Sequence, residues 1–352
     1  MTKDKLIDFL IKTEIPDDID SEKEKQIVSE IFKYSWDITP KKLYRYRNCT
    51  DYSFDALEND KFLLTKPTLF NDPYDSLLYI NRQKIIDEIT KPSKGKEDII
   101  HKLNTDLDFR KSQIELLGNE FVEKFSKVES FKNEIEKEVY KSLSNTIHSK
   151  FIDDLIDESI KSLKQSSLVG CLSERIDSVL MWSHYAENHT GFALNYDFNE
   201  RYSMDTKITG LKATEFTDKK LFPVKYTNQR FNATYYVEFH FIDNYYRSIG
   251  LELKKPFFDK LFYYKILLFK SMDWEYEKEW RIIKQTNLNY DDNKSNIDFI
   301  ENIKPKEIYL GANIEKSNKD RLIEISKSKN IPIHQMNLDL FSENYRLTID
   351  KN

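Results

Sequence analysis

Three short segments of the chain hold the side chains best suited to chemistry. They are Arg45 and Arg47; Trp182, Ser183, His184 and Tyr185; and Glu277, Glu279 and Arg281. Guanidinium groups bind phosphates and carboxylates through paired hydrogen bonds. Aromatic rings give a ligand a flat surface to pack on, and a carboxylate can move a proton or stabilise a developing positive charge. We therefore predict a single site in which Glu279 and Glu277 are catalytic and the other residues bind substrate.

The acidic segment can be interpreted in two ways. Residues 273–283 alternate in character and predict a strand, with Glu277, Glu279 and Arg281 on one face. An unpaired buried carboxylate costs several kcal/mol, so this face must be either wet or neutralised by cations. One interpretation is a structural ion-pair lattice that joins Glu277, Glu279 and Arg281 to Arg45 or Arg47. The other is a cleft for a charged, ring-bearing ligand.

A loop rich in turn-forming residues, 67–75, could form one wall of such a cleft. Its sequence Asn71-Asp72-Pro73 is the strongest turn signal in the chain. These residues either only form the turn or also contact a ligand. On the second interpretation, Asn71 and Asp72 join the substrate-binding candidates.

Other kinds of catalytic site have weaker signals. His184, His189 and His240 lack the spacing of a metal-binding motif, so no metal is predicted. Cys171 can be drawn as a nucleophile beside His184, but it lies in an apolar strand where cysteines usually belong to the core. The chain has no glycine-rich phosphate loop of the kind that marks dinucleotide-binding folds.

The elements that must position these residues predict an α+β fold with a central mixed or antiparallel sheet and flanking helices. The predicted strands cover residues 42–47, 61–65, 168–172, 192–196, 222–226, 273–283, 303–310 and 331–335. The predicted helices cover 3–13, 20–36, 53–59, 177–187, 231–249, 256–271 and 315–329. The helix over 256–271 is apolar on most sides and is expected to be buried, and residues 303–335 are expected to form a β-α-β unit.

The change in composition along the chain predicts its domain organisation. Residues 1–39 are N-terminal helices, 40–80 with 166–340 the core domain, and 341–352 a tail. Residues 81–165 repeat charged and apolar residues at helical spacing and predict an all-helical insertion that projects from the sheet or caps it. Its charge runs indicate solvated helix faces, or alternatively a regulatory or partner-binding surface.

Composition predicts a cytoplasmic protein. The net charge of −5 gives no global basic signature for nucleic acid, although a local basic cleft stays open. No apolar run reaches membrane-spanning length, and the N-terminal residues have no secretory apolar region. Two cysteines are too few for a disulfide framework, which favours a reducing compartment.

The order of motifs in the chain resembles a bacterial family, the domain of unknown function numbered twenty-nine seventy-one. The resemblance rests on LTKPTLFNDPYD, CLSE, DSVLMWSHYAENHTGFALNYD, PVKY, WEYEKEWRII and KEIYLGANI, and it covers roughly residues 40–80 and 168–336. Members resemble components of phage-defence or toxin-like loci. This resemblance implies an effector role.

A more distant likeness is to ADP-ribosyltransferases, which use an arginine on the first core strand, a serine-bearing segment and a Glu-x-Glu strand. It implies NAD as a substrate, with Arg45 or Arg47 at its phosphates or ribose. Trp182, Ser183 and Tyr185 would then wall the nicotinamide, and Glu279 or Glu277 would stabilise the oxocarbenium-like centre. The Ser-Thr-Ser pattern of that group is missing, and Ser183 is expected on a helix.

These observations give one leading hypothesis and two rivals. The leading one is a defence- or toxin-type effector with an NAD-binding cleft that cleaves NAD or transfers ADP-ribose to a protein or nucleic-acid acceptor. The first rival is a metal-dependent nuclease or other hydrolase whose acidic strand face collects Mg²⁺. The second is a non-catalytic sensor of a nucleotide or phage component. Such a sensor would assemble through residues 81–165, as a homo-oligomer or with a defence-system partner.

Overall fold

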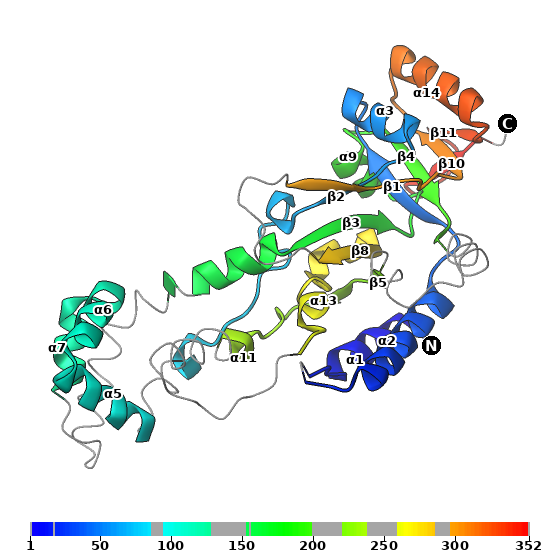
Figure 1. Cartoon of the computed structure of the whole chain (residues 1–352). Coiled ribbons are helices and arrows are strands. Elements are labelled where there is room, and N and C mark those ends of the chain that lie inside the picture. Colours follow the sequence, from blue (N-terminus) through cyan, green and yellow to red (C-terminus); the bar gives the residue numbers. More distant parts are fainter. Residues whose placement is uncertain are drawn as a thin grey trace.

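A computed structural model of the chain describes residues 2–16, 18–85, 94–127, 153–154, 156–198, 220–237, 259–285 and 296–350. Within these residues the main sheet runs in the order β12-β11-β10-β4-β1-β3-β2-β9, and β8 pairs with both β3 and β5 (Figure 1). Most neighbours are antiparallel and β10 with β11 is parallel, so the sheet is mixed. The predicted α+β class is confirmed.

The bounds of the strands follow the apolar and alternating runs of the sequence. They are β1 Leu43–Arg47, β2 Phe62–Thr65, β3 Ser167–Ser173, β4 Phe192–Tyr196, β5 Lys220–Pro223, β6 Lys225–Thr227, β7 Phe269–Ser271, β8 Glu279–Gln285, β9 Ile297–Ile300, β10 Glu307–Leu310, β11 Ile333–Leu338 and β12 Leu347–Ile349. Strands β6 and β7 form a separate two-stranded sheet. The last strand, β12, lies in the C-terminal segment and pairs with β11.

Several of the helices start at residues whose side chains cap them. They are α1 Lys3–Lys12, α2 Ser21–Ile38, α3 Asp51–Glu58, η1 Pro67–Leu69, α5 Lys94–Thr105, α6 Leu107–Leu117, α7 Asn119–Ser126, α9 Val179–Tyr185, α11 Thr234–Val237, α13 Phe262–Ile266, η4 Met272–Glu277 and α14 Lys316–Lys329. The side chains of Asp20, Thr50 and Ser178 accept hydrogen bonds from free backbone amides in the first turns of α2, α3 and α9.

Three apolar clusters hold helices against the sheet. The largest joins strand residues such as Leu43 and Leu194 to Phe54 of α3 and Leu322 of α14. A second packs α1 and α2 near β5 and β8. The third lies beneath α9 and includes Tyr44 and Tyr46. Leu43 and the two tyrosines thus face opposite sides of β1, as its alternation predicts.

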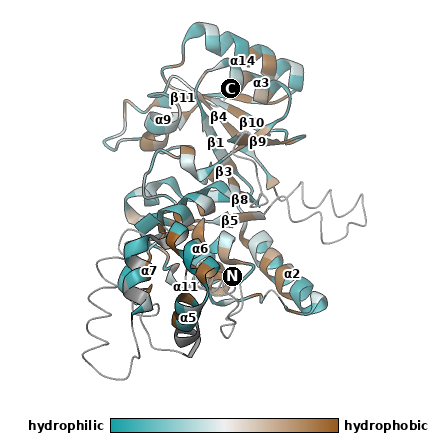
Figure 2. Cartoon of the chain, turned by 60° about the vertical axis from the view of Figure 1, so that its left-hand side comes forward, coloured by the Kyte–Doolittle hydropathy of each residue, from teal (hydrophilic) through white to brown (hydrophobic). Residues whose placement is uncertain are grey.

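Helices α5, α6 and α7 lie together away from the sheet (Figure 1), and Figure 2 shows long hydrophilic stretches along α6 and α7. Arg110 of α6 pairs with Glu123 of α7 at 2.5 Å. These helices belong to the predicted insertion over residues 81–165, of which 86–93, 128–152 and 155 lie outside the described residues. No helix in the described part of the chain is long and apolar enough to cross a membrane.

Two predicted elements near the acidic segment are wrong. In place of a helix over residues 256–271, the described part contains α13, which gives way to β7. In place of a strand over 273–283, η4 forms first, and β8 begins at Glu279 after Lys278 takes a left-handed conformation with φ 46°. Ser271 starts η4 by accepting a hydrogen bond from Asp273 N at 3.3 Å, so a local cap competes with the alternating pattern.

Two neighbouring predictions also change. The predicted strand over 222–226 divides at Val224, because β5 pairs with β8 while β6 pairs with β7. The predicted helix over 231–249 is represented by α11, and residues 238–258 lie outside the described part. The β-α-β unit is confirmed, since β10 and β11 are parallel and α14 connects them.

Candidate functional site

A pocket opens where two strands of the sheet separate. β1 pairs with β4 at five positions but with β3 only at Tyr44 and Ser173. Beyond that pair the two strands diverge, and the space between them forms a pocket of about 380 Å³. Such a volume lies within the ~300–1,000 Å³ typical of small-molecule sites.

The pocket collects most of the predicted site residues from five separate parts of the chain. Those that line it are Arg45, Arg47, Asn71, His184, Tyr185, Glu277 and Glu279. Strand β1 supplies the arginines, the loop after η1 supplies Asn71, α9 supplies the ring residues, and η4 with β8 supplies the carboxylates. The sheet therefore brings the three predicted segments to one cavity.

Four predicted residues do not line this pocket. Trp182 is fully buried, and its Nε1 donates to the carbonyl of Ile176 at 2.7 Å, so it anchors α9. Ser183 donates to the carbonyl of Val179 within the same helix at 2.9 Å. Asp72 lines a neighbouring pocket, and Arg281 lies buried behind the wall.

The two arginines have no acidic partner among the described residues. Arg45 is 8% exposed, its Nη1 has no hydrogen-bond partner, and its guanidinium carbon lies 4.1 Å from the ring centre of Phe62. Burial, and then the charge of Arg47, lower the pKa of Arg45 to about 9. Burial also lowers the pKa of Arg47. Buried cations without a counter-ion are costly, and an anion in the pocket would reduce this cost.

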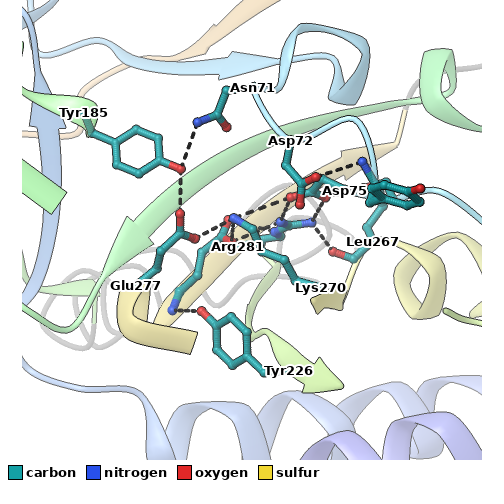
Figure 3. A network of polar contacts seen from close by, with 12 residues as sticks. Asn71, Asp72, Asp75, Tyr185, Tyr226, Leu267, Lys270, Glu277 and Arg281 are labelled. Atoms are coloured by element: carbon teal, nitrogen blue, oxygen red, sulfur yellow. Dashed lines mark hydrogen bonds and ion pairs between the residues drawn. The ribbon is translucent and has the colours of Figure 1, made fainter. Parts of the chain in front are cut away.

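Another part of the pocket lining is an acidic cluster held by cations. Nζ of Lys270 lies 2.5 Å from Oε2 of Glu277 and 3.0 Å from Oε2 of Glu279. Nε of Arg281 donates to Oε1 of Glu279 at 2.8 Å, and its Nη1 and Nη2 donate to Asp75 at 2.9 and 2.5 Å. Figure 3 shows this network, in which Nη1 of Arg281 also donates to the carbonyl of Leu267 at 2.7 Å.

An ion-pair lattice therefore exists, in which Arg281 takes part as predicted, but Lys270 takes the place predicted for Arg45 or Arg47. Its cations are Lys270 and Arg281, while Arg45 and Arg47 stay outside it. The two interpretations of the acidic segment each describe one part of the structure. Arg281 binds both carboxylate oxygens of Glu279 within the lattice. Glu277 belongs to the lattice through Lys270 and also lines the pocket.

The two glutamates differ in protonation. Burial raises the pKa of Glu277 to about 7, and the charge of Glu279 adds to this effect. Burial also acts to raise the pKa of Glu279, but the charges of Arg281 and Lys270 outweigh it and hold that pKa well below its ordinary value. Glu279 is thus a fixed anion, and Glu277 can exchange a proton near neutral pH.

Ring-bearing residues frame the carboxylate of Glu277. The Tyr185 hydroxyl donates to its Oε1 at 2.6 Å and accepts from Nδ2 of Asn71 at 3.4 Å (Figure 3). The exposed ring of His184 lies 6.3 Å from Trp274 and 6.4 Å from Tyr276. Of these rings, His184 and Tyr185 line the pocket, while Trp274 lines a neighbouring one.

Sequence reasoning missed Lys270 and Asp75, although both line the pocket. Lys270 falls in the apolar run that predicts a buried helix. A charged residue within such a run needs a buried partner, and this signal could have identified Lys270 as a candidate. Asp75 ends the turn-rich loop, where an aspartate is common for reasons of turn formation alone. Arg281, the partner of Asp75, lies 206 residues away in sequence, so only the folded chain reveals the role of Asp75. The partners of Lys270 are close in sequence but lie beyond the turn that η4 makes.

Two other kinds of site have no support among the described residues. No group of three or more His, Cys, Asp or Glu side chains there is placed to hold a metal ion. Burial, and then the charge of Glu279, raise the pKa of Cys171 well above its ordinary value. This shift is opposite to the one that activates a nucleophilic thiol.

Part of this site lies in a region that matches a known family model. Residues 181–282 match the model of a family described as "Protein of unknown function (DUF2971)". These residues are therefore similar to DUF2971. The match begins in α9 and ends in β8, so the DUF2971 region contributes Tyr185, Lys270 and both glutamates. The arginines of β1 lie outside the matched range.

The matched DUF2971 region confirms the family resemblance within a narrower range than the sequence motifs suggest. It spans less than a third of the 352 residues. No significant match was found among curated proteins or among solved structures.

Proposed function

We propose that the pocket binds NAD and breaks the bond between nicotinamide and ribose, passing ADP-ribose to an acceptor or to water. One observation carries this proposal. Two arginines that have no acidic partner among the described residues line the same pocket as two carboxylates. NAD has the same division of charge, with an anionic pyrophosphate at one end and a nicotinamide whose departure leaves positive charge on the ribose.

The arginines would hold the phosphates. The free Nη1 of Arg45 supplies an N–H donor that already lies in a low-dielectric site, where a charged hydrogen bond is strong. Arg47 is on the same strand face, two residues along. Together they could bind the two phosphate groups of one pyrophosphate.

Glu277 would take part in the reaction itself. As the glycosidic C–N bond breaks, nicotinamide leaves with the bonding electrons, and the positive charge on C1′ is stabilised by the Glu277 carboxylate. An acceptor hydroxyl or amine, or a water molecule, then forms the new bond to C1′ and gives its proton to Glu277. A pKa of about 7 suits such a proton acceptor.

Glu279 would act as a positioning residue. Both of its carboxylate oxygens are engaged by Arg281, and one also contacts Lys270. It therefore keeps Lys270 charged and in place beside Glu277. The cellular role that we propose is that of an effector that depletes NAD or modifies a macromolecule.

The test is incubation of the purified protein with NAD labelled in the adenosine part, with and without cell extract. We expect nicotinamide release or label transfer, and its loss in Glu277→Gln. Glu275→Gln is the matched control, since Glu275 is on η4 but pairs with Lys278 at the surface. Turnover should persist in this control.

The same assay separates the rival functions. NAD binding without turnover would overturn the proposal in favour of a sensor. Cleavage of nucleic acid that stops on addition of a chelator would overturn it in favour of a metal-dependent nuclease. Full activity of Glu277→Gln would remove the assigned role of that carboxylate.

A further inference from the structure

A second pocket lies beside the first, and Lys270 lines both. It has a volume of about 350 Å³, and its lining includes Asp72, Phe231, Phe269 and Trp274. We propose that this second pocket binds a cationic group, a guanidinium or an ammonium, carried by a second ligand. Neither the arginine-lined pocket nor its chemistry accounts for these residues.

The buried carboxylate of Asp72 is the first support. Asp72 is 6% exposed, and its Oδ1 accepts a hydrogen bond from the backbone N of Tyr74 at 2.8 Å. Its other oxygen, Oδ2, is buried and has no hydrogen-bond partner. A buried anionic oxygen without a donor is costly, and a ligand with an N–H donor and a positive charge would satisfy it.

The aromatic lining is the second support. Phe231 and Phe269 meet edge-to-face with their ring centres 5.2 Å apart. Rings in this pocket already attract ammonium groups, since Nζ of Lys270 lies 5.0 Å from the ring centre of Trp274 and Nζ of Lys225 lies 5.8 Å from that of Phe269. Aromatic walls next to a carboxylate are a combination that selects cations.

The cations described around this pocket form no hydrogen bond with Oδ2 of Asp72. Arg230 donates from Nη1 to the carbonyl of Leu78 at 3.3 Å and lies over the ring of Tyr79. Lys270 is paired with the two glutamates of the lattice. Lys164 is attracted by the charges of Asp75 and Asp72, but it forms no hydrogen bond with Oδ2 of Asp72. A ligand cation is thus the partner that Asp72 lacks.

The position of the pocket suggests what the ligand does. Lys270 separates it from Glu277, so a cationic side chain bound here would lie next to the proposed reaction site. It would be the acceptor of ADP-ribose or a residue that anchors the acceptor. That role rests on the proposed function, whereas the binding of a cation does not.

The experiment measures binding without NAD. The four tryptophans are labelled as 5-fluorotryptophan, and the signal of Trp274 is assigned with the variant Trp274→Phe. Three capped amino acids are titrated: N-acetyl-arginine methylamide, its lysine counterpart, and the neutral citrulline counterpart. We expect a saturable shift of the Trp274 fluorine signal with a cationic probe and none with citrulline. The arginine and lysine probes show which cation fits better.

Two matched variants locate the binding group. Asp72→Asn keeps the oxygen that accepts from Tyr74 N but removes the charge, and it should weaken binding by about tenfold or more. Asp273→Asn changes an exposed acid of the same pocket and should have little effect. Melting temperatures close to that of wild type confirm that both variants fold.

Three outcomes would overturn the proposal. They are an absent or unsaturable shift, equal binding of citrulline, and an equal effect of the two aspartate variants. NAD turnover is measured separately. Binding of the cation without any NAD reaction would support the cation site and reject the proposed function. An NAD reaction without binding of the cation would support the proposed function and reject the cation site.

Discussion

The Tyr185 hydroxyl donates a hydrogen bond of 2.6 Å to Glu277, and Lys270 lies 2.5 Å from the other oxygen of the same carboxylate. Helix α9 and strand β7 thus meet at one carboxylate whose pKa is about 7. Its protonation and its charge depend on partners that the fold brings from separate segments. This arrangement makes the protein's stability and activity sensitive to single substitutions.

Glu277 should make stability depend on pH. The folded protein binds a proton at Glu277 between pH 4.5 and about 7, where the ordinary carboxyl of the unfolded chain does not. The contribution of this group is therefore fully present below pH 4.5 and is lost as the pH rises through about 7, a change of about 3 kcal/mol. Urea unfolding of Glu277→Gln across this range should lack the decline. Equal pH dependence in wild type and variant would contradict the prediction.

Arg45 should reduce stability while it enables binding. Arg45→Met removes a buried charge that has no acidic partner and keeps an unbranched side chain of similar length. We expect the free energy of unfolding to rise by about 1–2 kcal/mol, and binding of NAD or pyrophosphate to be lost. Denaturant unfolding and calorimetric titration measure the two effects. A less stable variant that still binds would disprove this trade-off.

Arg281 should behave in the opposite way, although it is also a buried arginine. Arg281→Met leaves the carboxylates of Asp75 and Glu279 without their main cation. We expect a loss of about 3–5 kcal/mol in the free energy of unfolding. Denaturant unfolding beside Arg45→Met makes the comparison direct. If both variants shift stability in the same direction, the distinction between lattice and anion-binding arginines fails.

Gly191 should be essential for the position of β1. A Cβ at this residue would lie 2.2 Å from the carbonyl oxygen of Arg47, which is backbone and cannot rotate away. Gly191→Ala should therefore lower the free energy of unfolding by about 2 kcal/mol or more and weaken anion binding, because β1 carries both arginines. At Gly118, which has φ +86°, an added Cβ would meet no atom within 4 Å, so alanine there should cost about 1–3 kcal/mol through backbone strain alone and leave anion binding unchanged. Equal weakening of anion binding in both variants would argue against a steric effect on β1.

The hydrophobic pattern of the sequence predicted an element correctly where the surrounding structure favours the same secondary structure. The strand over 192–196 has its predicted bounds, and the β-α-β unit forms as predicted, because apolar alternation and helix capping agree with the sheet that receives them. Prediction failed over 256–283. There, Ser271 caps η4 and Lys278 takes a left-handed backbone conformation, and together they turn the chain between β7 and β8. Neither feature can be predicted from hydrophobic periodicity.

The sequence by itself determined the chemical types of the site: paired arginines on one strand face, a ring-bearing segment, and two glutamates near an arginine. Only the tertiary structure decided which of them meet. Asp75 joined the network of the glutamates because the fold brings it to Arg281, 206 residues away in sequence. Lys270 joined it because η4 turns the chain and places Glu277 and Glu279 beside the Lys270 ammonium group. The same fold left Arg45 without a partner, because β1 and β3 separate after one position. Charge neutralisation is a property of distances in space, and residue spacing along the chain does not contain those distances.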